Sequence, residues 1–506
     1  MCGIVAAIGD IDVSSCRNML HRIAHRGPDD TGEVRKHNVW LGHQRLSIMD
    51  VEGGHQPMTH APTGTYLVVN GEIYNHRHIR QDLGHALFET GSDSEAALHA
   101  LVIDGPAGLA RLRGMFALAF ATEDGDFLAA RDSLGVKPLY WARRDGVTLF
   151  ASELRAFDPA DRPLVETFPP GHCWSPEGGL VRFADAVPAH VRPARRAAEP
   201  EWDSSLVKAV REAIVSSVEH RMMSDVGVGV FLSGGLDSAI VAAVAAEYAA
   251  RQDQPLPTFA VGSEGSSDLL AARHVAEYLQ AKHHNIEHHE IPMSRQDAVE
   301  ALPRAVRAIE HFDPSLVRSA VPNLLLAEYA SQHVHAVLTG EGADELFAGY
   351  PYYHQEPFTS PEALQAELVR TVRELHHLNL QRCDRASMAF GLEAREPFLD
   401  RDVVEFVLSI PPEYKMVRPG VPEKQLLREA FDGWLPNEIL HRGKEQFGDG
   451  AGAKELLEDA VRDLPEVAAA DGVELRNREE AGYYAIWKRE LDGIRPSATL
   501  GLFATT

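Results

Sequence analysis

The sequence predicts a mixed α/β chain in two parts: stacked antiparallel sheets with helices, followed by a parallel sheet with helices and a helical C-terminal region. Three observations predict this. Up to about residue 150, short β-rich runs alternate with turns. Beyond about residue 200, Ala-rich helical stretches alternate with short buried strands. Between them, residues 187–200 are rich in Pro, Ala and Arg and read as a linker.

The first part is expected to be antiparallel because its strands are separated by short turns. Residues 66–69 form a β-rich run that reaches Asn70-Gly71, a dipeptide typical of turns. Residues 115–122 and 127–130 flank an acidic, Gly-containing turn and predict a hairpin. A helical stretch at 94–103 interrupts the strands.

The second part is expected to be a parallel sheet because its strands alternate with helices. Strands are predicted at 226–232, 258–262 and 336–339, each ending in a loop of small residues, and a helix at 237–250. From about residue 361 the chain reads as mostly helical. Ligands usually bind at the carboxyl ends of parallel strands, so the loops are candidate sites.

Composition restricts the partners. The chain has 506 residues and a net charge of −25, of which −5 falls in residues 1–200 and −20 in residues 201–506. This balance argues against nucleic-acid and anionic-membrane partners. Four scattered cysteines make no disulfide framework, and no apolar run is long enough to span a bilayer. We expect a reducing, cytoplasmic compartment.

Candidate catalytic residues begin at the N-terminus. Removal of the initiator Met would leave Cys2 with a thiol and an α-amine, so one residue supplies nucleophile and base. Asn70-Gly71 offers a side-chain amide beside a backbone N–H, as an oxyanion hole requires. Arg45 could bind an α-carboxylate and Asp93 an α-ammonium. Taken singly, Asn70-Gly71 is more often an ordinary turn, and Arg45 and Asp93 are more often surface salt-bridge residues.

In combination these residues resemble the glutaminase domain of class II amidotransferases. The resemblance rests on five segments in order: 2–4, 25–29, 45–48, 70–75 and 91–93. It implies an N-terminal-nucleophile (Ntn) hydrolase αββα sandwich over residues 1–190, with hydrolysis of glutamine to glutamate and ammonia through a thioester. It assigns Cys2 as the nucleophile and Asn70 and Gly71 as the oxyanion hole. The implied glutamine-binding residues are Arg45, Asn70, Glu72 and Asp93.

The second part carries a candidate nucleotide site. Ser233-Gly234-Gly235-Leu236-Asp237-Ser238 joins a predicted strand to a helix, so its backbone N–H groups and helix N-terminus suit a phosphate. Residues 339–345 follow another strand and bring the carboxylates of Glu341 and Asp344 together, which suits Mg²⁺ or an incoming amine. Lys444 could neutralise a departing pyrophosphate. A plain helix cap and a surface lysine are the alternatives.

The same segments, with 259–262, 339–350 and 391–400, resemble glutamine-dependent asparagine synthetases up to about residue 450. The resemblance implies an ATP-pyrophosphatase domain over residues 204–506, a linker at 191–203, and amidation of a carboxylate through an acyl-adenylate. ATP-binding residues would be Leu232, Ser233, Gly234, Gly235, Asp237, Ser238, Val261, Thr339 and Gly340. Mg²⁺ would be held by Asp237 and Asp344. Glu341 and Lys444 would be catalytic, and the acceptor would contact Ser315, Arg318, Glu341 and Asp344.

The sequence also departs from this family. Two adjacent threonines usually precede the acceptor-binding arginine, whereas here Ser315 is followed by Leu316. Aspartate is the expected acceptor, and the same chemistry on another carboxylate stays open. An inactive paralogue that senses glutamine or a nucleotide is the alternative of a different class. The family often forms dimers, so a homodimer is also left open. Four clustered histidines (His283, His284, His288 and His289) are interpreted as structural rather than as a metal site.

Overall fold

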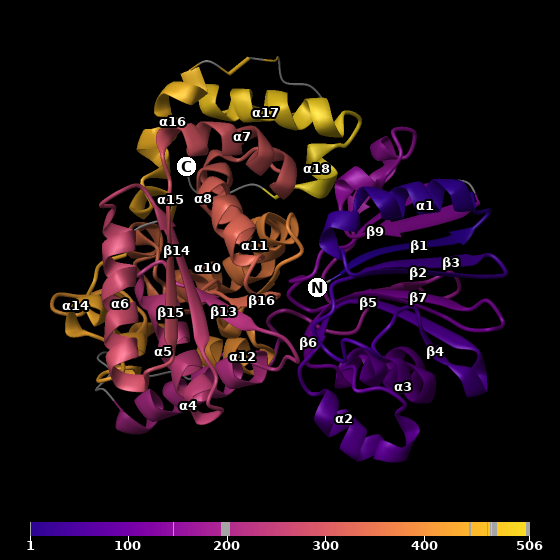
Figure 1. The fold of residues 1–506 in the computed structure, drawn as a ribbon, viewed down its shortest axis with the longest axis horizontal. Helices are drawn as coiled ribbons and strands as arrows, with labels where there is room; N and C mark the ends of the chain where they lie inside the picture. Colours follow the sequence, from indigo (N-terminus) through magenta and orange to yellow (C-terminus); the bar gives the residue numbers. More distant parts are fainter. Residues whose placement is uncertain are drawn as a thin grey trace.

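The computed structural model describes residues 2–501 except 145, 194–202, 445–446, 463, 466, 468–472 and the side chains of 449, 458 and 459. Two units lie side by side (Figure 1). We call them the sandwich unit, built on two antiparallel sheets, and the parallel unit, built on one parallel sheet. The predicted linker at 191–203 falls almost entirely outside the described residues.

The sandwich unit contains two six-stranded sheets. The first has the order β10-β8-β9-β1-β3-β2, with strands Val165–Thr167, Tyr140–Arg144, Val147–Ala151, Gly3–Gly9, Val39–Arg45 and Asp30–Lys36. The second has the order β12-β11-β7-β6-β5-β4, with strands Gly179–Arg182, His172–Ser175, Phe127–Arg131, Gly114–Ala121, Thr65–Ile73 and Met58–His60. Every pairing that the register defines in these sheets is antiparallel.

Alternation along β1 explains the layering. Ile4 and Ala6 belong to the core between the sheets, whereas Val5 and Ala7 pack with helix α1 (Val13–Arg22) on the outside. Successive strand residues point to opposite faces, so an entirely apolar strand fits between two apolar layers. Helix α3 (Ser94–Asp104) covers the outer face of the second sheet, and α2 (His76–Leu83) lies beside it. The four layers confirm the predicted αββα sandwich.

The parallel unit contains a five-stranded sheet of order β15-β14-β13-β16-β17, and every pair in it is parallel. The strands are Ile286–Pro292, Leu256–Gly262, Val228–Phe231, Ala336–Leu338 and Glu393–Arg395. Its crossover helices are α5 (Leu236–Arg251), α6 (Ser267–His283), α7 (Arg295–Ile309) and α8 (Pro314–Ala330). Helix α5 is Ala-rich and buried along most of its length, which suits a position between sheet and neighbouring helices.

The remaining helices complete the parallel unit. They are α4 (Ser204–Arg221), α9 (Ala343–Phe347), α10 (Pro361–Glu374), α11 (Asn379–Met388), α12 (Arg401–Ser409), α13 (Gln425–Ala430), α14 (Asn437–Leu440), α15 (Phe447–Gly450), α16 (Ala453–Arg462), α17 (Arg478–Leu491) and α18 (Pro496–Thr499). Helices α16 and α17 lie over α7 (Figure 1). Among the described helices, none combines the length and apolar character needed to cross a bilayer.

The predicted elements are largely confirmed. The hairpin is β6–β7, and the helices predicted at 94–103 and 237–250 are α3 and α5. The turn predicted at Asn70-Gly71 is wrong, because β5 continues through both residues to Ile73 and stays paired with β6. The short strand β17 was not predicted, since three residues among helices carry no periodic signal.

Candidate active sites

Cys2 is buried where the first sheet meets the parallel unit. Its backbone N–H donates to Asn70 Oδ1 at 3.0 Å, and its Sγ lies 4.0 Å from the carbonyl oxygen of Leu46. Burial raises the pKa of the Cys2 thiol, so the resting group is neutral. A base must therefore take its proton before it can attack a substrate.

Asn70 and Gly71 lie beside Cys2 on strand β5. Because Asn70 Oδ1 accepts from Cys2, its Nδ2 is left buried, and it has no hydrogen-bond partner among the described residues. Gly71 has φ +151°, and a Cβ there would lie 1.9 Å from the carbonyl oxygen of Met115. Glycine thus lets the backbone pass close to β6. An unpartnered amide donor beside a thiol has the chemistry of an oxyanion hole.

The predicted glutamine-binding residues surround this pair. Arg45 ends β3, and its guanidinium donates to the carbonyl oxygens of Asp50 (2.7 Å) and Val51 (3.0 Å). Asp93 Oδ2 accepts from Ile73 N at 2.6 Å, and burial raises the pKa of Asp93 to about 6. Burial, together with Asp93, also raises the pKa of Glu72 well above its usual range. Neighbouring cations do not fully neutralise these two buried acids, so the site suits recognition of a substrate ammonium.

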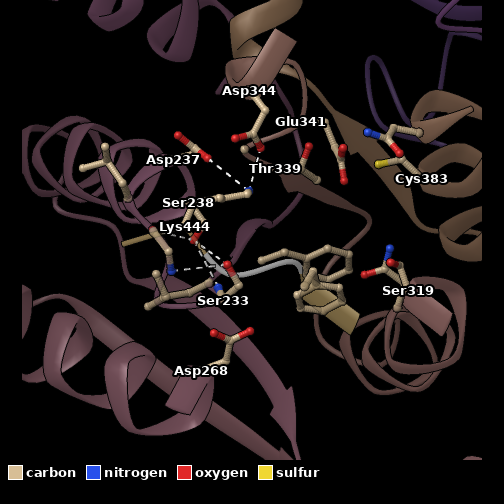
Figure 2. A pocket seen from close by; sticks show the side chains of 18 of the residues that line it. Ser233, Asp237, Ser238, Asp268, Ser319, Thr339, Glu341, Asp344, Cys383 and Lys444 are labelled. Atoms are coloured by element: carbon tan, nitrogen blue, oxygen red, sulfur yellow. Dashed lines mark hydrogen bonds and ion pairs between the residues drawn. The ribbon is translucent and has the colours of Figure 1, made fainter. Parts of the chain in front are cut away.

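A pocket opens at the carboxyl ends of β13, β14 and β16, where the parallel sheet is expected to bind ligands (Figure 2). Twelve of the predicted residues line it: Leu232, Ser233, Gly235, Asp237, Ser238, Val261, Ser315, Thr339, Gly340, Glu341, Asp344 and Lys444. Gly234 and Arg318 are not among the lining residues. Gly234 instead allows the chain to turn. Its φ is +72°, and a Cβ on it would clash with the backbone nitrogen of Ala272.

The loop between β13 and α5 is shaped by its serines. Ser238 Oγ accepts from Ser233 N at 3.2 Å and lies 3.0 Å from Ser233 Oγ. Gly340 approaches the start of α5 so closely that a Cβ on it would lie 2.9 Å from the Cβ of Asp237. The loop after β16 therefore packs directly on the predicted phosphate loop.

Two lysines neutralise the carboxylates of this pocket. Lys424 Nζ lies 2.6 Å from both Asp237 Oδ2 and Asp344 Oδ1, and Lys444 Nζ lies 2.6 Å from Asp344 Oδ2 (Figure 2 draws the Lys444 pair). Burial acts to raise the pKa of Asp344, but the two ammonium groups outweigh it and lower that pKa to about 2. Asp344 is therefore ionised at every physiological pH.

The same two aspartates fit the predicted Mg²⁺ site. Mg²⁺ is usually bound by one or two carboxylates together with substrate phosphates and waters. Asp237 and Asp344 converge on Lys424 Nζ, so their oxygens are close enough to share one cation. The donor set is consistent with Mg²⁺ delivered with a nucleotide.

Buried bonds join the two centres. Arg26 Nε donates to the carbonyl oxygen of Cys2 at 3.0 Å, and Arg26 Nη1 lies 2.9 Å from Asp384 of α11. Arg395 of β17 approaches Glu72 at 3.4 Å. Arg26 and Arg395 are fully buried. The parallel unit therefore forms part of the wall around Cys2.

Comparisons with known proteins agree with this geometry. A family profile described as a glutamine amidotransferase domain matches residues 1–167, and one described as asparagine synthase matches residues 209–363 and 357–488. The chain is 39% identical over 481 residues to asparagine synthetase [glutamine-hydrolyzing] 3 of Arabidopsis thaliana, covering 89% of this chain and 79% of that protein. It is 38% identical over 480 residues to the Asparagus officinalis enzyme of that name, covering 89% and 78%.

The chain belongs to the asparagine synthetase family. The resemblance inferred from the motifs is thereby confirmed, as is the pairing of an amidotransferase part with an asparagine synthase part. The family uses ATP, in keeping with the pocket at the end of the parallel strands.

Leu316, which departs from the residue pattern expected of the asparagine synthetase family, lies outside the pocket. Leu316 is 1% exposed and packs in the hydrophobic core, whereas Ser315 lines the pocket. Arg318 turns away from the pocket and lies 3.5 Å from Glu479 of α17. The acceptor roles of Ser315 and Arg318 stay predictions.

Sequence reasoning missed Lys424 and Arg382 in the nucleotide pocket, and it missed the contact of Arg395 with Glu72 outside that pocket. Lys424 bridges Asp237 and Asp344, and Arg382 of α11 forms an ion pair with Glu341. Both Lys424 and Arg382 line the pocket. A single lysine or arginine distant in sequence from its partner has no spacing that could reveal it. The motif around 391–400 was recognised, but not that Arg395 reaches Glu72.

The histidine cluster has structural surroundings. His288 Nδ1 lies 2.9 Å from Thr258 Oγ1, and the ring of His289 stacks on Phe259 with centroids 5.1 Å apart. Within the described part of the chain, the grouping with metal-binding geometry is Glu374, His376 and His377, not these residues. The geometry supports the structural interpretation.

Proposed function

We propose that the chain is a glutamine-hydrolysing asparagine synthetase. Residues 1–190 would form the glutaminase, 191–203 the linker and 204–506 the synthetase. The observation that supports this proposal most directly is the position of helix α11, because residues of one of its turns face both the nucleotide pocket and the surroundings of Cys2. Arg382 and Cys383 line the nucleotide pocket, while Asp384 binds the arginine that holds the carbonyl group of Cys2.

In the proposed glutaminase reaction, the α-amine of Cys2 accepts the thiol proton and Sγ attacks the side-chain amide carbon of glutamine. The amide C–N bond breaks, ammonia leaves, and water hydrolyses the thioester to glutamate. Asn70 Nδ2 and Gly71 N–H would stabilise the oxyanion. Arg45, Glu72 and Asp93 would bind the charged groups of glutamine.

In the proposed synthetase reaction, a carboxylate oxygen of aspartate attacks the α-phosphorus of ATP and pyrophosphate leaves. Ammonia then attacks the acyl carbon and AMP leaves, which yields asparagine. Lys444 and Lys424 would neutralise the phosphates, and Glu341, which pairs with Arg382 in the pocket, would accept a proton from the incoming ammonia. Bound Mg²⁺ would offset phosphate charge and would be held by Asp237 and Asp344.

The test is ATP–pyrophosphate exchange with the purified chain and a panel of carboxylic acids. Aspartate is expected to support exchange and other acids to be weak. Exchange with another acid, and none with aspartate, would replace the acceptor while leaving the chemistry in place. That second candidate is favoured because Arg318, the predicted acceptor-binding arginine, is not among the residues that line the pocket. Absence of exchange with every acid would support the inactive sensor. Free, buried cysteines support a reducing compartment such as the cytoplasm.

A further inference from the structure

A second pocket lies at the boundary between the two units, apart from both proposed centres. It is lined by His25 and Arg155 from the sandwich unit, and by Arg304 and Arg307 of α7 with Arg385 of α11 from the parallel unit. None of the described residues that line it is acidic. This is notable in a chain with 74 acidic and 49 basic residues.

One wall of this pocket is apolar. Phe390 lies there with Leu324 and two alanines, and the Arg304 guanidinium is 5.8 Å from the centre of the Phe390 ring. The pocket therefore offers positive charge on one side and an aromatic surface on the other. That combination suits an anion that carries an apolar or aromatic group.

Each lining arginine already pairs with an acid outside the lining, and Arg155 and Arg385 both pair with Glu310. Two observations nevertheless leave N–H groups for a ligand. Arg385 is 1% exposed, and its Nη2 is buried with no hydrogen-bond partner among the described residues. Arg304 and Arg307 pair at 2.8 Å with Glu328 and Glu490, but each of these groups is about 40% exposed or more. Exposed ion pairs are weak, so both arginines can turn toward a ligand at little cost.

We propose that this pocket binds a small molecule bearing a phosphate group, bridging the two units. Several convergent guanidiniums match the oxygens of a phosphate through paired N–H bonds. The site borders the buried network around Cys2, because Arg155 also lies 3.0 Å from Glu153, which pairs with Arg26. A ligand here would therefore bind apart from the reacting substrates.

The test is calorimetric titration of the full-length protein with inorganic phosphate and with phenyl phosphate. A non-hydrolysable ATP analogue and Mg²⁺ are kept at saturation, so that the nucleotide pocket is already filled. Both probes are expected to bind, and phenyl phosphate more tightly because of the Phe390 wall. The double variant Arg304→Gln, Arg307→Gln should bind about ten-fold more weakly or worse, since charge-assisted hydrogen bonds are lost.

The matched control is Arg273→Gln on α6, which removes a half-exposed arginine that pairs with Glu290 of β15. It should leave phosphate binding unchanged. Equal phosphate affinity in the double variant and the control would overturn the proposal. Absence of phosphate binding while the nucleotide analogue fills the other pocket would also overturn it. Both variants replace exposed side chains, so thermal unfolding should be close to that of the parent and binding can be compared directly.

Discussion

Buried carboxylates are held in opposite ways in the two centres. Asp93, near Cys2, has a pKa raised to about 6 by burial, whereas Asp344, in the nucleotide pocket, has a pKa lowered to about 2 by Lys424 and Lys444. Both side chains are buried. The glutaminase centre therefore leaves negative charge for a substrate ammonium, while the synthetase pocket neutralises its acids before an anionic nucleotide arrives.

The largest effect is expected from Cys2→Ala, which tests whether the two centres are separate. Loss of the thiol should abolish glutamine-dependent synthesis, because Cys2 is the cysteine that lies beside Asn70. Synthesis from added ammonium should continue. Product formation with each nitrogen donor measures this, and parallel loss of both activities would contradict separate centres.

Asp237→Ala is expected to impair the synthetase reaction and to spare the glutaminase reaction. It removes a carboxylate from Lys424 and from the proposed Mg²⁺ site, so ATP–pyrophosphate exchange should fall by about 100-fold or more. Glutamine hydrolysis should continue near the parent rate. Glu247→Ala on the same helix α5 is the control, since Glu247 does not line the pocket. Equal damage to both half-reactions would undercut the assignment of Asp237.

Asn70→Asp separates the two roles of that side chain. The aspartate can still accept from Cys2 N–H but lacks the unpartnered amide donor. Glutaminase kcat should fall by about 10²–10³, the usual cost of losing one oxyanion donor. The glutaminase kcat of Asn70→Ala should fall at least as far. If Asn70→Asp kept the parent kcat in steady-state assays, the oxyanion role would be wrong.

A pH dependence of glutamine binding is expected from Asp93. Its carboxyl group is ionised above pH 6 and becomes protonated below it, so attraction for the substrate ammonium is lost as pH falls. Using Cys2→Ala to prevent turnover, the Kd for glutamine should rise by up to about ten-fold per pH unit below pH 6. Asp344, with a pKa of about 2, adds no transition in this range. A constant Kd from pH 7.5 to 5 would contradict the assignment.

The smallest change in activity is expected from substitution of Leu316. Because this side chain is buried in the core, Leu316→Thr should destabilise the protein by about 2–4 kcal/mol without restoring an acceptor contact. Leu316→Val has nearly the same shape as threonine and isolates the cost of the hydroxyl. Urea unfolding measures the stability, and the KM for aspartate measures the contact. A lower KM in Leu316→Thr than in Leu316→Val would place the position in the acceptor site.

The comparison also shows what sequence reasoning can reach. Ser233 to Ser238 run from the loop after β13 into the first turn of α5, so their proximity follows from local order. All of them except Gly234 line one pocket. Asn70-Gly71 was expected in a turn, yet it lies within β5, because pairing with β6 outweighs the local preference of the dipeptide. Local preference is weak where a partner strand supplies hydrogen bonds.

Contacts between distant residues were out of reach. Lys424 meets Asp237 across 187 positions, and Arg26 meets Asp384 across 358. The charge step from −5 to −20 along the chain gave no hint that a pocket lined by four arginines lies between the two units. Such pairs depend on the packing of both units, which no local pattern encodes.

The Arg26–Asp384 contact has a consequence for synthesis on the ribosome. Strands of the sandwich unit are complete at Arg182, but Asp384 and Arg395 emerge some 200 residues later. At about 5–20 residues per second, this delay lasts roughly 10–40 s. Lys137 also depends on the later residues, because its Nζ donates to the carbonyl oxygen of Ala394 at 3.3 Å. During that interval the sides of Arg26, Lys137 and Glu72 that meet the parallel unit face water, although all three are buried in the finished protein. The polar face that the sandwich unit presents to water during synthesis thus becomes part of the interior once the parallel unit has folded against it.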